Sequence, residues 1–257
     1  MSDSPLSADH PPHNLAAQRG TAYSPLYRQI KHLLLQSLDQ GEWKPGEAIP
    51  SETELAARFQ VSQGTVRKAI DELATENLLF RRQGKGTFVA THHEPRVRFR
   101  FLRLAADDEQ QHVSSSRILE CRRVKVPAAI ADLLELATND IVVNLRRLLL
   151  FDDVPTIYDD IWLPGQVFRG LTAESLSRNQ GPLYALFETE FGVSMVRADE
   201  KVRAVAASQP VADLLEVAVN HPLLQVERVS YTYGDRPVEV RRGLYLTSHY
   251  HYRNTLN

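Results

Sequence analysis

The stretch from Pro50 to Val89 restricts the possible folds more than any other part of this chain, because its pattern predicts two short helices followed by a hairpin. Ser51 and Glu54 have the spacing of a capping box, in which the two residues satisfy each other's free backbone N–H groups, so we expect a helix to begin there. Ser62 is a second N-cap candidate, at the start of a helix expected over 63–76. The apolar stripe of this second helix consists of Val66, Ala69, Ile70 and Leu73.

The first turn of the second helix is unsuited to a protein core. Its side chains are small or form hydrogen bonds, and in a helix that enters the major groove this turn faces the base edges. They are Gln63, Gly64, Thr65 and Arg67. Two β-rich runs follow, over 78–82 and 87–89, and the glycines of the segment between them permit a sharp turn with positive φ. A helical hairpin with a solvated basic face is the alternative. It explains neither the lack of apolar side chains in the first turn of the second helix nor the glycine-rich turn that carries Lys85.

This pattern resembles the winged helix-turn-helix of the GntR family of bacterial transcription regulators. The matching motifs are Pro50-Ser51-Glu52, Glu54-Leu55-Ala56, Val61-Ser62, Thr65-Val66-Arg67-Lys68-Ala69 and Gln83-Gly84-Lys85-Gly86-Thr87-Phe88-Val89. The resemblance implies sequence-specific binding of double-stranded DNA. The DNA-contacting residues that it implies are Ser51, Thr53, Ser62, Gln63, Thr65, Arg67, Lys68, Arg82, Gln83, Gly84 and Lys85.

Two positions in this region depart from the family pattern. Many relatives have arginine where this chain has Thr53 and Gln63, and glutamine suits adenine whereas arginine reads guanine. We therefore expect an operator that differs from the common one, with Arg67 as the main candidate for a guanine contact. The wing residues suit contacts to phosphates or the minor groove, with a solvated face as the alternative for its arginines. They are Arg81, Arg82, Gly84 and Lys85.

Charge and composition agree with two globular domains behind a polar tail. The 257 residues carry a net charge of -2, yet residues 62–100 hold eight Lys and Arg against four Asp and Glu, an excess suited to phosphates. We expect a disordered tail over 1–22, the DNA-binding domain over 23–90, a linker over 91–97 and a second domain over 98–257.

Cysteine content and hydropathy bear on the cellular compartment. Cys121 is the only cysteine, which excludes an intramolecular disulfide and fits a reducing cytoplasm. The N-terminus lacks the basic-then-apolar pattern of a signal peptide, and no apolar run is long enough to cross a bilayer. These observations predict a cytoplasmic protein.

The polar segment His92-His93-Glu94 allows two interpretations. Adjacent histidines beside a carboxylate suggest a metal site, but neighbouring side chains of an extended segment point in opposite directions, and no third ligand lies at a metal-site spacing. We therefore predict a solvated linker, with no bound metal or other cofactor. The run 96–101 alternates basic and apolar residues like a half-buried strand, and its arginines either extend the DNA-facing surface or face water.

The C-terminal region contains an internal repeat with an offset of 81 residues. The sequence ADLLELA at 131–137 recurs as ADLLEVA at 212–218, and at the same offset Arg147 corresponds to Arg228. Each copy predicts a short helix, a strand, a turn ending in proline and a returning strand. Two such units can share one antiparallel sheet, which we expect to have helices on one face. The predicted fold class is therefore α+β, with concave space between two similar halves.

This layout resembles the effector-binding UTRA domain of the HutC branch of GntR regulators, whose fold is similar to that of chorismate lyase. The resemblance extends over residues 116–252. In the family, polar residues of both repeats and of a central helix bind a small, often anionic, metabolite. The positions implied here are Arg147, Asp159, Tyr184, Glu239 and Tyr245. Together they offer a guanidinium for a carboxylate or phosphate, acids for hydroxyl or amine donors, and aromatic walls.

Two further departures bear on the ligand. Leu149 stands where sugar-phosphate-binding relatives commonly have a second arginine, and Pro182 replaces a hydroxyl residue, so both changes remove anion-binding capacity. An organic acid or an amino-acid catabolite therefore fits better than a phosphosugar. Taken alone, Arg147 also suits an ion pair across the sheet, and Tyr184 and Tyr245 also suit core positions with a solvated hydroxyl.

A helix-turn-helix protein usually reads two half-sites, so we expect a homodimer whose affinity for DNA changes when the metabolite binds. Repression relieved by ligand is the expected sign. Two other classes remain open. The lyase-like fold suggests an enzyme, but the sequence shows no nucleophile–base pair, metal-spaced cluster or phosphate loop. The small basic excess disfavours a sequence-tolerant DNA-binding protein. We therefore predict a regulator and not an enzyme.

Overall fold

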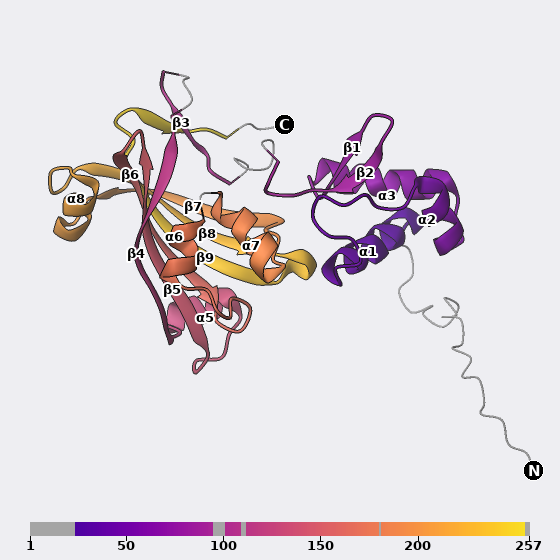
Figure 1. The fold of residues 1–257 in the computed structure, drawn as a ribbon, viewed down its shortest axis with the longest axis horizontal. Coiled ribbons are helices and arrows are strands. Elements are labelled where there is room, and N and C mark those ends of the chain that lie inside the picture. Colours follow the sequence, from indigo (N-terminus) through magenta and orange to yellow (C-terminus); the bar gives the residue numbers. More distant parts are fainter. Residues whose placement is uncertain (1–23, 95–100, 109–111, 180, 255–257) are drawn as a thin grey trace, which may run out of the picture.

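The computed structural model of the chain describes residues 24–94, 101–108, 112–179 and 181–254. It contains two bodies, a helical domain near the N-terminus and a larger α+β domain (Figure 1). The predicted tail and nearly all of the run 96–101 lie outside the described residues. Among the helices of the described part, none is long and apolar enough to span a membrane.

The N-terminal domain consists of three helices and a two-stranded hairpin. The helices are α1 (Leu26–Asp39), α2 (Glu52–Phe59) and α3 (Gln63–Thr75), and the hairpin pairs β1 (Leu79–Arg82) with β2 (Gly86–Val89). The capping box predicted at Ser51 and Glu54 is present, and the Ser62 side chain accepts a hydrogen bond from the backbone N–H of Thr65. The winged helix-turn-helix is therefore confirmed.

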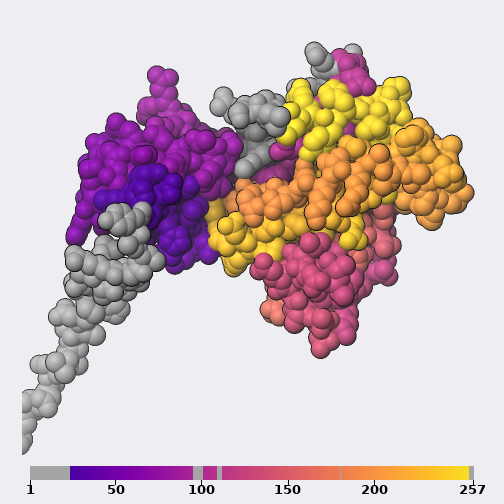
Figure 2. Space-filling model, turned by 180° about the vertical axis from the view of Figure 1, so that it is seen from behind, coloured from indigo at the N-terminus to yellow at the C-terminus, as the bar shows by residue number. Residues whose placement is uncertain are grey.

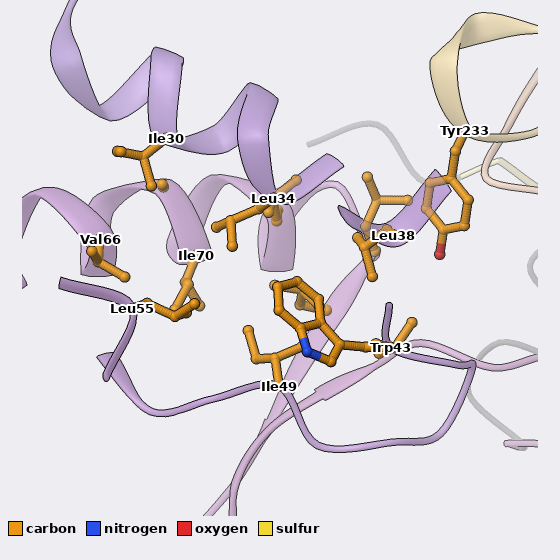
Figure 3. Packing of buried hydrophobic residues seen from close by; sticks show 14 residues of the cluster. Ile30, Leu34, Leu38, Trp43, Ile49, Leu55, Val66, Ile70 and Tyr233 are labelled. Carbon is orange, nitrogen blue, oxygen red and sulfur yellow. The ribbon is translucent and has the colours of Figure 1, made fainter. Parts of the chain in front are cut away.

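One face of each helix forms the core of this domain (Figure 3). Leu34 of α1, Leu55 of α2 and Ile70 of α3 are almost fully buried. The four buried positions of α3 are those of the predicted stripe. Gln60 adopts the left-handed conformation after α2, which ends that helix and turns the chain toward α3. This packing leaves the start of α3 at the surface.

The C-terminal domain is built around a six-stranded antiparallel sheet with the order β4-β5-β6-β9-β8-β7. The strands are β4 (Ser114–Lys125), β5 (Ile141–Phe151), β6 (Val154–Pro164), β7 (Arg197–Ala206), β8 (Pro222–Tyr231) and β9 (Pro237–Tyr245). Two shorter strands, β3 (Leu104–Ala106) and β10 (Tyr250–Tyr252), pair with each other outside this sheet. The helices are α5 (Ala128–Leu134), α6 (Ala173–Arg178), α7 (Leu183–Phe191) and α8 (Gln209–Leu215), and η2 (Tyr233–Asp235) is a short 3-10 turn.

The two halves of the sheet repeat each other, as the sequence predicts. Helices α5 and α8 both end at a glutamate in the left-handed conformation, Glu135 and Glu216, at the repeat offset. The last strands of the halves, β6 and β9, pair in the centre of the sheet around Asp160 and Arg242. Polar residues of both halves therefore meet in the middle of one sheet.

Helices cover both faces of the sheet, so the expectation that they lie on one face is wrong. Helix α5 packs on Val142 and α8 on Leu148, both even-numbered positions of β5. Helices α6 and α7 pack on the odd-numbered Val143 and Leu145. Because successive residues of a strand face opposite sides, the two pairs of helices lie on opposite faces. Helices α6 and α7 belong to the segment between the copies, whose face the repeat does not determine.

The two domains contact each other through the turn between β8 and β9. Tyr233 of η2 is buried in the core of the N-terminal domain, near Leu38 of α1 (Figure 3). Arg236 of the same turn forms an ion pair of 2.6 Å with Asp39. Seen from the opposite side, the indigo-to-purple N-terminal domain lies beside the larger C-terminal domain and touches it (Figure 2). This turn therefore contributes a buried side chain and an ion pair to the contact between the domains.

The chain is buried where it leaves the N-terminal domain, so the prediction of a solvated linker is wrong for Thr91 and His92. Glu188 of α7 accepts hydrogen bonds from Thr91 Oγ1 at 2.8 Å and from the His92 backbone N–H at 2.9 Å. The His92 ring nitrogen Nε2 lies 3.1 Å from the carbonyl oxygen of Met195. Partners distant in the sequence satisfy these polar groups, which local composition does not reveal. The described residues contain no group of three or more His, Cys, Asp or Glu placed to hold a metal ion.

Candidate DNA-reading surface and effector pocket

The starts of α2 and α3 and the wing meet around one carboxylate. Glu52, the first residue of α2, accepts hydrogen bonds from Arg67 Nε at 2.9 Å and from Gln63 Nε2 at 3.3 Å. Its other oxygen lies 2.9 Å from Nη2 of Arg81 on β1. The hydrogen bond from Arg67 holds the pKa of Glu52 below its ordinary value, so this carboxylate is charged at neutral pH. Three elements predicted to touch DNA are therefore tied together.

The other candidates on α2 and α3 lie at the surface. Ser51, Thr53 and Ser62 are exposed, whereas Thr65 is half-buried. The hydroxyl oxygens of Ser62 and Thr65 lie 2.9 Å apart. The two serines cap their helices, so their positions also follow from local structure, and Thr53 is an exposed residue of the first turn of α2.

Two of the basic residues predicted to contact DNA, Lys68 and Arg82, lie against aromatic rings. Lys68 Nζ is 4.0 Å from the centre of the Tyr27 ring. The Arg82 guanidinium lies 4.7 Å from the centre of the Phe88 ring and forms an ion pair with Glu94. Such contacts restrict long side chains that otherwise sample many rotamers.

The wing has an exposed tip at Gln83, Gly84 and Lys85. Gly84 and Gly86 have φ values of 69° and 110°, which residues with a Cβ rarely adopt. The tip thus depends on glycine at both positions. It leaves the Lys85 ammonium at the end of the hairpin.

A cavity of about 350 Å³ lies in the C-terminal domain, on the sheet face covered by α6 and α7. Both halves of the sheet, the segment before α7 and the segment before β3 contribute to its lining. Its volume suits a small metabolite. The polar residues that line it are Ser114, Ser115, Ser116, Arg147, Asp159, Ser177, Asn179, Tyr184, Arg228, Arg241 and Tyr245.

Two arginines share one carboxylate in this cavity. Asp159 Oδ2 lies 3.0 Å from Arg147 Nη2 and 3.3 Å from Arg241 Nη1. Arg241 also donates from Nε to Glu239 Oε1 at 2.7 Å. Burial lowers the pKa of Arg147. It acts in the same direction on Arg241, but there Glu239, Tyr184 and Asp159 together outweigh burial and raise the pKa. Both guanidinium groups stay charged. The two arginines and two carboxylates balance, so the cluster carries no net charge.

One oxygen of Asp159 is left for another donor. Asp159 Oδ1 is buried and has no hydrogen-bond partner among the residues that the structure describes. Gly243 makes room for it, because a Cβ at this position would lie 3.1 Å from Oδ1 and 2.3 Å from Cε1 of Tyr245. Burial raises the pKa of Tyr245 to about 12, so its hydroxyl stays protonated. A buried carboxylate oxygen without a donor suits a ligand amine or hydroxyl.

The structure brings the five residues predicted to bind the effector close together, but only four of them line the cavity. Arg147, Asp159, Tyr184 and Tyr245 line the cavity. Glu239 is fully buried and is not part of the lining; it accepts a hydrogen bond from the Tyr184 hydroxyl at 3.0 Å. Glu239 thus holds lining residues in place.

Two lining arginines are missing from the predicted set, and the repeat offset marks the position of only one of them, Arg228. Arg228 is the repeat counterpart of Arg147, and Arg241 lies 82 positions after Asp159, one more than the repeat offset. Arg228 donates from Nε to Glu200 Oε1 at 2.6 Å. A longer turn in the second copy shifts the register by one residue, which hides the second correspondence.

Helix α7 connects the cavity with the segment between the domains. Tyr184 in its first turn lines the cavity, and its ring centre lies 5.2 Å from that of His92. Glu188, one turn later, holds Thr91 and the His92 backbone. Burial raises the pKa of Glu188 above its ordinary value. Helix α7 therefore contacts both the cavity and the chain that leads to the DNA-binding domain.

Comparison with known proteins decides the family. Residues 26–89 match the bacterial regulatory proteins of the gntR family, and residues 109–251, more than half of the chain, match the UTRA domain. The chain belongs to the GntR family. Its UTRA domain places it in the HutC subfamily, and this membership makes it a transcription regulator rather than an enzyme.

Individual relatives agree with this assignment. The ligand-binding domain of a GntR-family transcriptional regulator from Bordetella bronchiseptica is 64% identical, with a TM-score of 0.60, over 61% of this chain and 98% of that domain. A fructoselysine utilization operon transcriptional repressor of Escherichia coli is 29% identical over 84% of this chain and 88% of its own length. An HTH-type transcriptional regulator of Mycobacterium tuberculosis is 32% identical over 88% and 83%, respectively.

Proposed function

We propose that this GntR-family chain is a homodimeric cytoplasmic repressor that binds an operator through α3 and the wing and releases it when a small metabolite enters the UTRA-domain cavity. The sign of regulation is supported by similar proteins that are named as repressors, among them the fructoselysine operon repressor of Escherichia coli. The observation that carries the proposal is the cavity around Arg147, Asp159 and Arg241, which α7 links to the chain between the domains.

The ligand that suits this cavity is an organic acid or amino-acid catabolite. A phosphosugar needs an excess of positive charge, but the arginines at the centre are matched by carboxylates. Leu149 lines the wall without charge, and Pro182 precedes α7 without a side-chain hydrogen bond to it. A carboxylate can bind the outer edge of a guanidinium, while an amine or hydroxyl donates to Asp159 Oδ1. A compact molecule that carries a carboxylate and also an amine or hydroxyl can bind the guanidinium edge and Asp159 Oδ1 at the same time.

The dimer follows from the geometry of DNA reading. One recognition helix covers one half-site, and two-fold symmetry places a second reader about one helical turn away along the duplex. Ligand binding changes operator affinity only to the extent that the ligand binds the two arrangements of the readers with different affinity. The contacts of α7 with His92 offer a route for that difference.

Thermal unfolding against a panel of metabolites, followed by gel shifts on a selected duplex, tests the proposal. A ligand at a hundred times its Kd adds roughly 2.7 kcal/mol of stability, which moves the midpoint visibly. We expect an acid or amino-acid catabolite to stabilise the protein and to weaken DNA binding. Sedimentation velocity on the same samples checks the dimer.

A matched pair of variants places the ligand. Leu149→Trp fills the cavity and leaves the charged cluster intact, whereas Val202→Trp adds the same side chain at an exposed position of β7. The ligand response should vanish in the first variant and persist in the second. A ligand that stabilises the protein without changing DNA affinity contradicts the coupling, and equal affinity for selected and scrambled duplexes contradicts sequence-specific reading.

A further inference from the structure

Glu52 is an acidic residue at the centre of the basic surface predicted to meet DNA. Its side chain is 19% exposed, and its carboxylate is in contact with Gln63, Arg67 and Arg81. Phosphates repel a carboxylate, so at this place it weakens sequence-independent binding. Its contacts indicate what it contributes instead.

The contact with Arg67 uses one edge of the guanidinium. Nε and Nη2 of Arg67 both lie 2.9 Å from Oε2 of Glu52. Arginine has five N–H groups in a planar fork, so the outer edge formed by Nη1 and Nη2 keeps donors for another acceptor. That edge has the geometry that matches O6 and N7 of guanine. Glu52 therefore restrains Arg67 while leaving its base-reading edge available.

The contact with Gln63 sets the direction of an amide. Gln63 Nε2 donates to Oε2 of Glu52, and the reverse orientation would place the amide oxygen against a carboxylate oxygen. Glutamine reads adenine with its oxygen and its nitrogen in a defined order. Fixing the amide thus fixes the order in which the base meets donor and acceptor.

The contact with Arg81 connects the wing to the same point. Arg81 Nη2 lies 2.9 Å from Glu52 Oε1 and 2.9 Å from Asp71 Oδ1 of α3. Asp71 touches the wing arginine, whereas Glu52 touches the wing and also the two readers of α3. Asp71 is therefore a matched control: an acid on the same surface, bound to the same arginine, whereas Gln63 donates to Glu52 in the described part of the chain.

We propose that Glu52 is a positioning residue that sets operator specificity by holding Arg67 and Gln63 in their base-reading orientations. The proposal rests on the DNA-reading role assigned above to the start of α3. Without Glu52 both side chains regain rotamer freedom, so they lose part of their preference for the correct bases. At the same time the surface loses a negative charge and binds any duplex more tightly. The affinities for the correct operator and for an unrelated duplex therefore become more similar.

The test compares Glu52→Gln with Asp71→Asn, Arg67→Ala and the wild type in the full-length chain. The probes are a duplex selected by the wild-type protein from a random pool and a scrambled duplex of the same composition. The measured quantities are Kd for both duplexes across a salt series and the base preferences found when each variant repeats the selection. Thermal unfolding checks that every variant is folded.

We expect Glu52→Gln to reduce the ratio of the two affinities about tenfold, the lower part of the range for one bidentate base contact. Binding of the scrambled duplex should strengthen, and base preference should relax at the positions read by α3. Asp71→Asn should strengthen both affinities and keep their ratio. An unchanged ratio in Glu52→Gln, or an equal loss in Asp71→Asn, overturns the proposal. An unchanged ratio in Arg67→Ala overturns the reading role of α3 instead, so the two failures are distinct.

Discussion

Tyr233 of the effector domain is buried in the core of the DNA-binding domain, so its replacement by alanine tests whether the two domains unfold as one unit. The residue is 9% exposed and belongs to the same cluster as Leu38 and Trp43. The same turn also forms an ion pair with the DNA-binding domain, between Arg236 and Asp39, whose side chains are 65% and 37% exposed. The two contacts differ greatly in expected strength.

Truncation of a buried aromatic residue to alanine costs about 3–5 kcal/mol. Tyr233 lies at a boundary between domains that can readjust, so we expect the lower end, about 3 kcal/mol. An exposed ion pair contributes about 0–1 kcal/mol because water and salt screen it. The tyrosine therefore accounts for most of the coupling at this turn, and Arg236→Ala should have little effect.

Differential scanning calorimetry of the full-length chain measures this coupling. In Tyr233→Ala the DNA-binding domain should unfold at a lower temperature than in the wild type, as a transition separate from that of the effector domain. Tyr231→Ala is the control, because this half-buried tyrosine lies two residues earlier and contacts Arg197 at the end of β8 rather than the N-terminal core. A single, unshifted transition in Tyr233→Ala would refute the reasoning.

Three further predictions concern the second domain. Burial raises the pKa of Glu188, so the protonated side chain stabilises the fold. This contribution is full below the unfolded pKa of about 4.3 and is lost as pH rises through the folded pKa. In Glu188→Gln the free energy of unfolding in urea should therefore change less with pH across this window, and a pH dependence equal to that of the wild type contradicts the prediction. Gly243→Ala forces the Tyr245 ring to move and should abolish the ligand-induced thermal shift while costing about 1–3 kcal/mol in urea unfolding; a wild-type shift contradicts the close packing. Asp159→Asn leaves Arg147 without a charged partner in a buried site and should cost about 3–5 kcal/mol by the same assay; a loss below about 1 kcal/mol shows that the ion pair is not buried.

The elements that the sequence predicted well are those whose signals are local. The capping box of Ser51 and Glu54 and the stripe that ends at Leu73 specify α2 and α3 through contacts within a few residues. The repeat in the second domain reveals β5 and β8 with Arg147 and Arg228 at equivalent places. Both kinds of signal survive without knowledge of the tertiary contacts.

The misses have a common cause in contacts between distant segments. His92 reads as part of a polar linker, yet Glu188 and the Met195 carbonyl satisfy its polar groups inside the protein. Arg241 looks like an ordinary strand residue, and only the pairing of β6 with β9 places it beside Asp159. No local pattern encodes such partners.

The sequence by itself determined the family, the helix starts, the wing turn and the two-fold repeat, because capping, periodicity and glycine conformations act over short distances. Only the tertiary structure decided which faces of the sheet carry helices, which charges cancel in the cavity and which carboxylate restrains Arg67. These properties depend on side chains brought together from separate elements, where burial sets the strength of each interaction. Operator reading and ligand response are both built from contacts of this second kind.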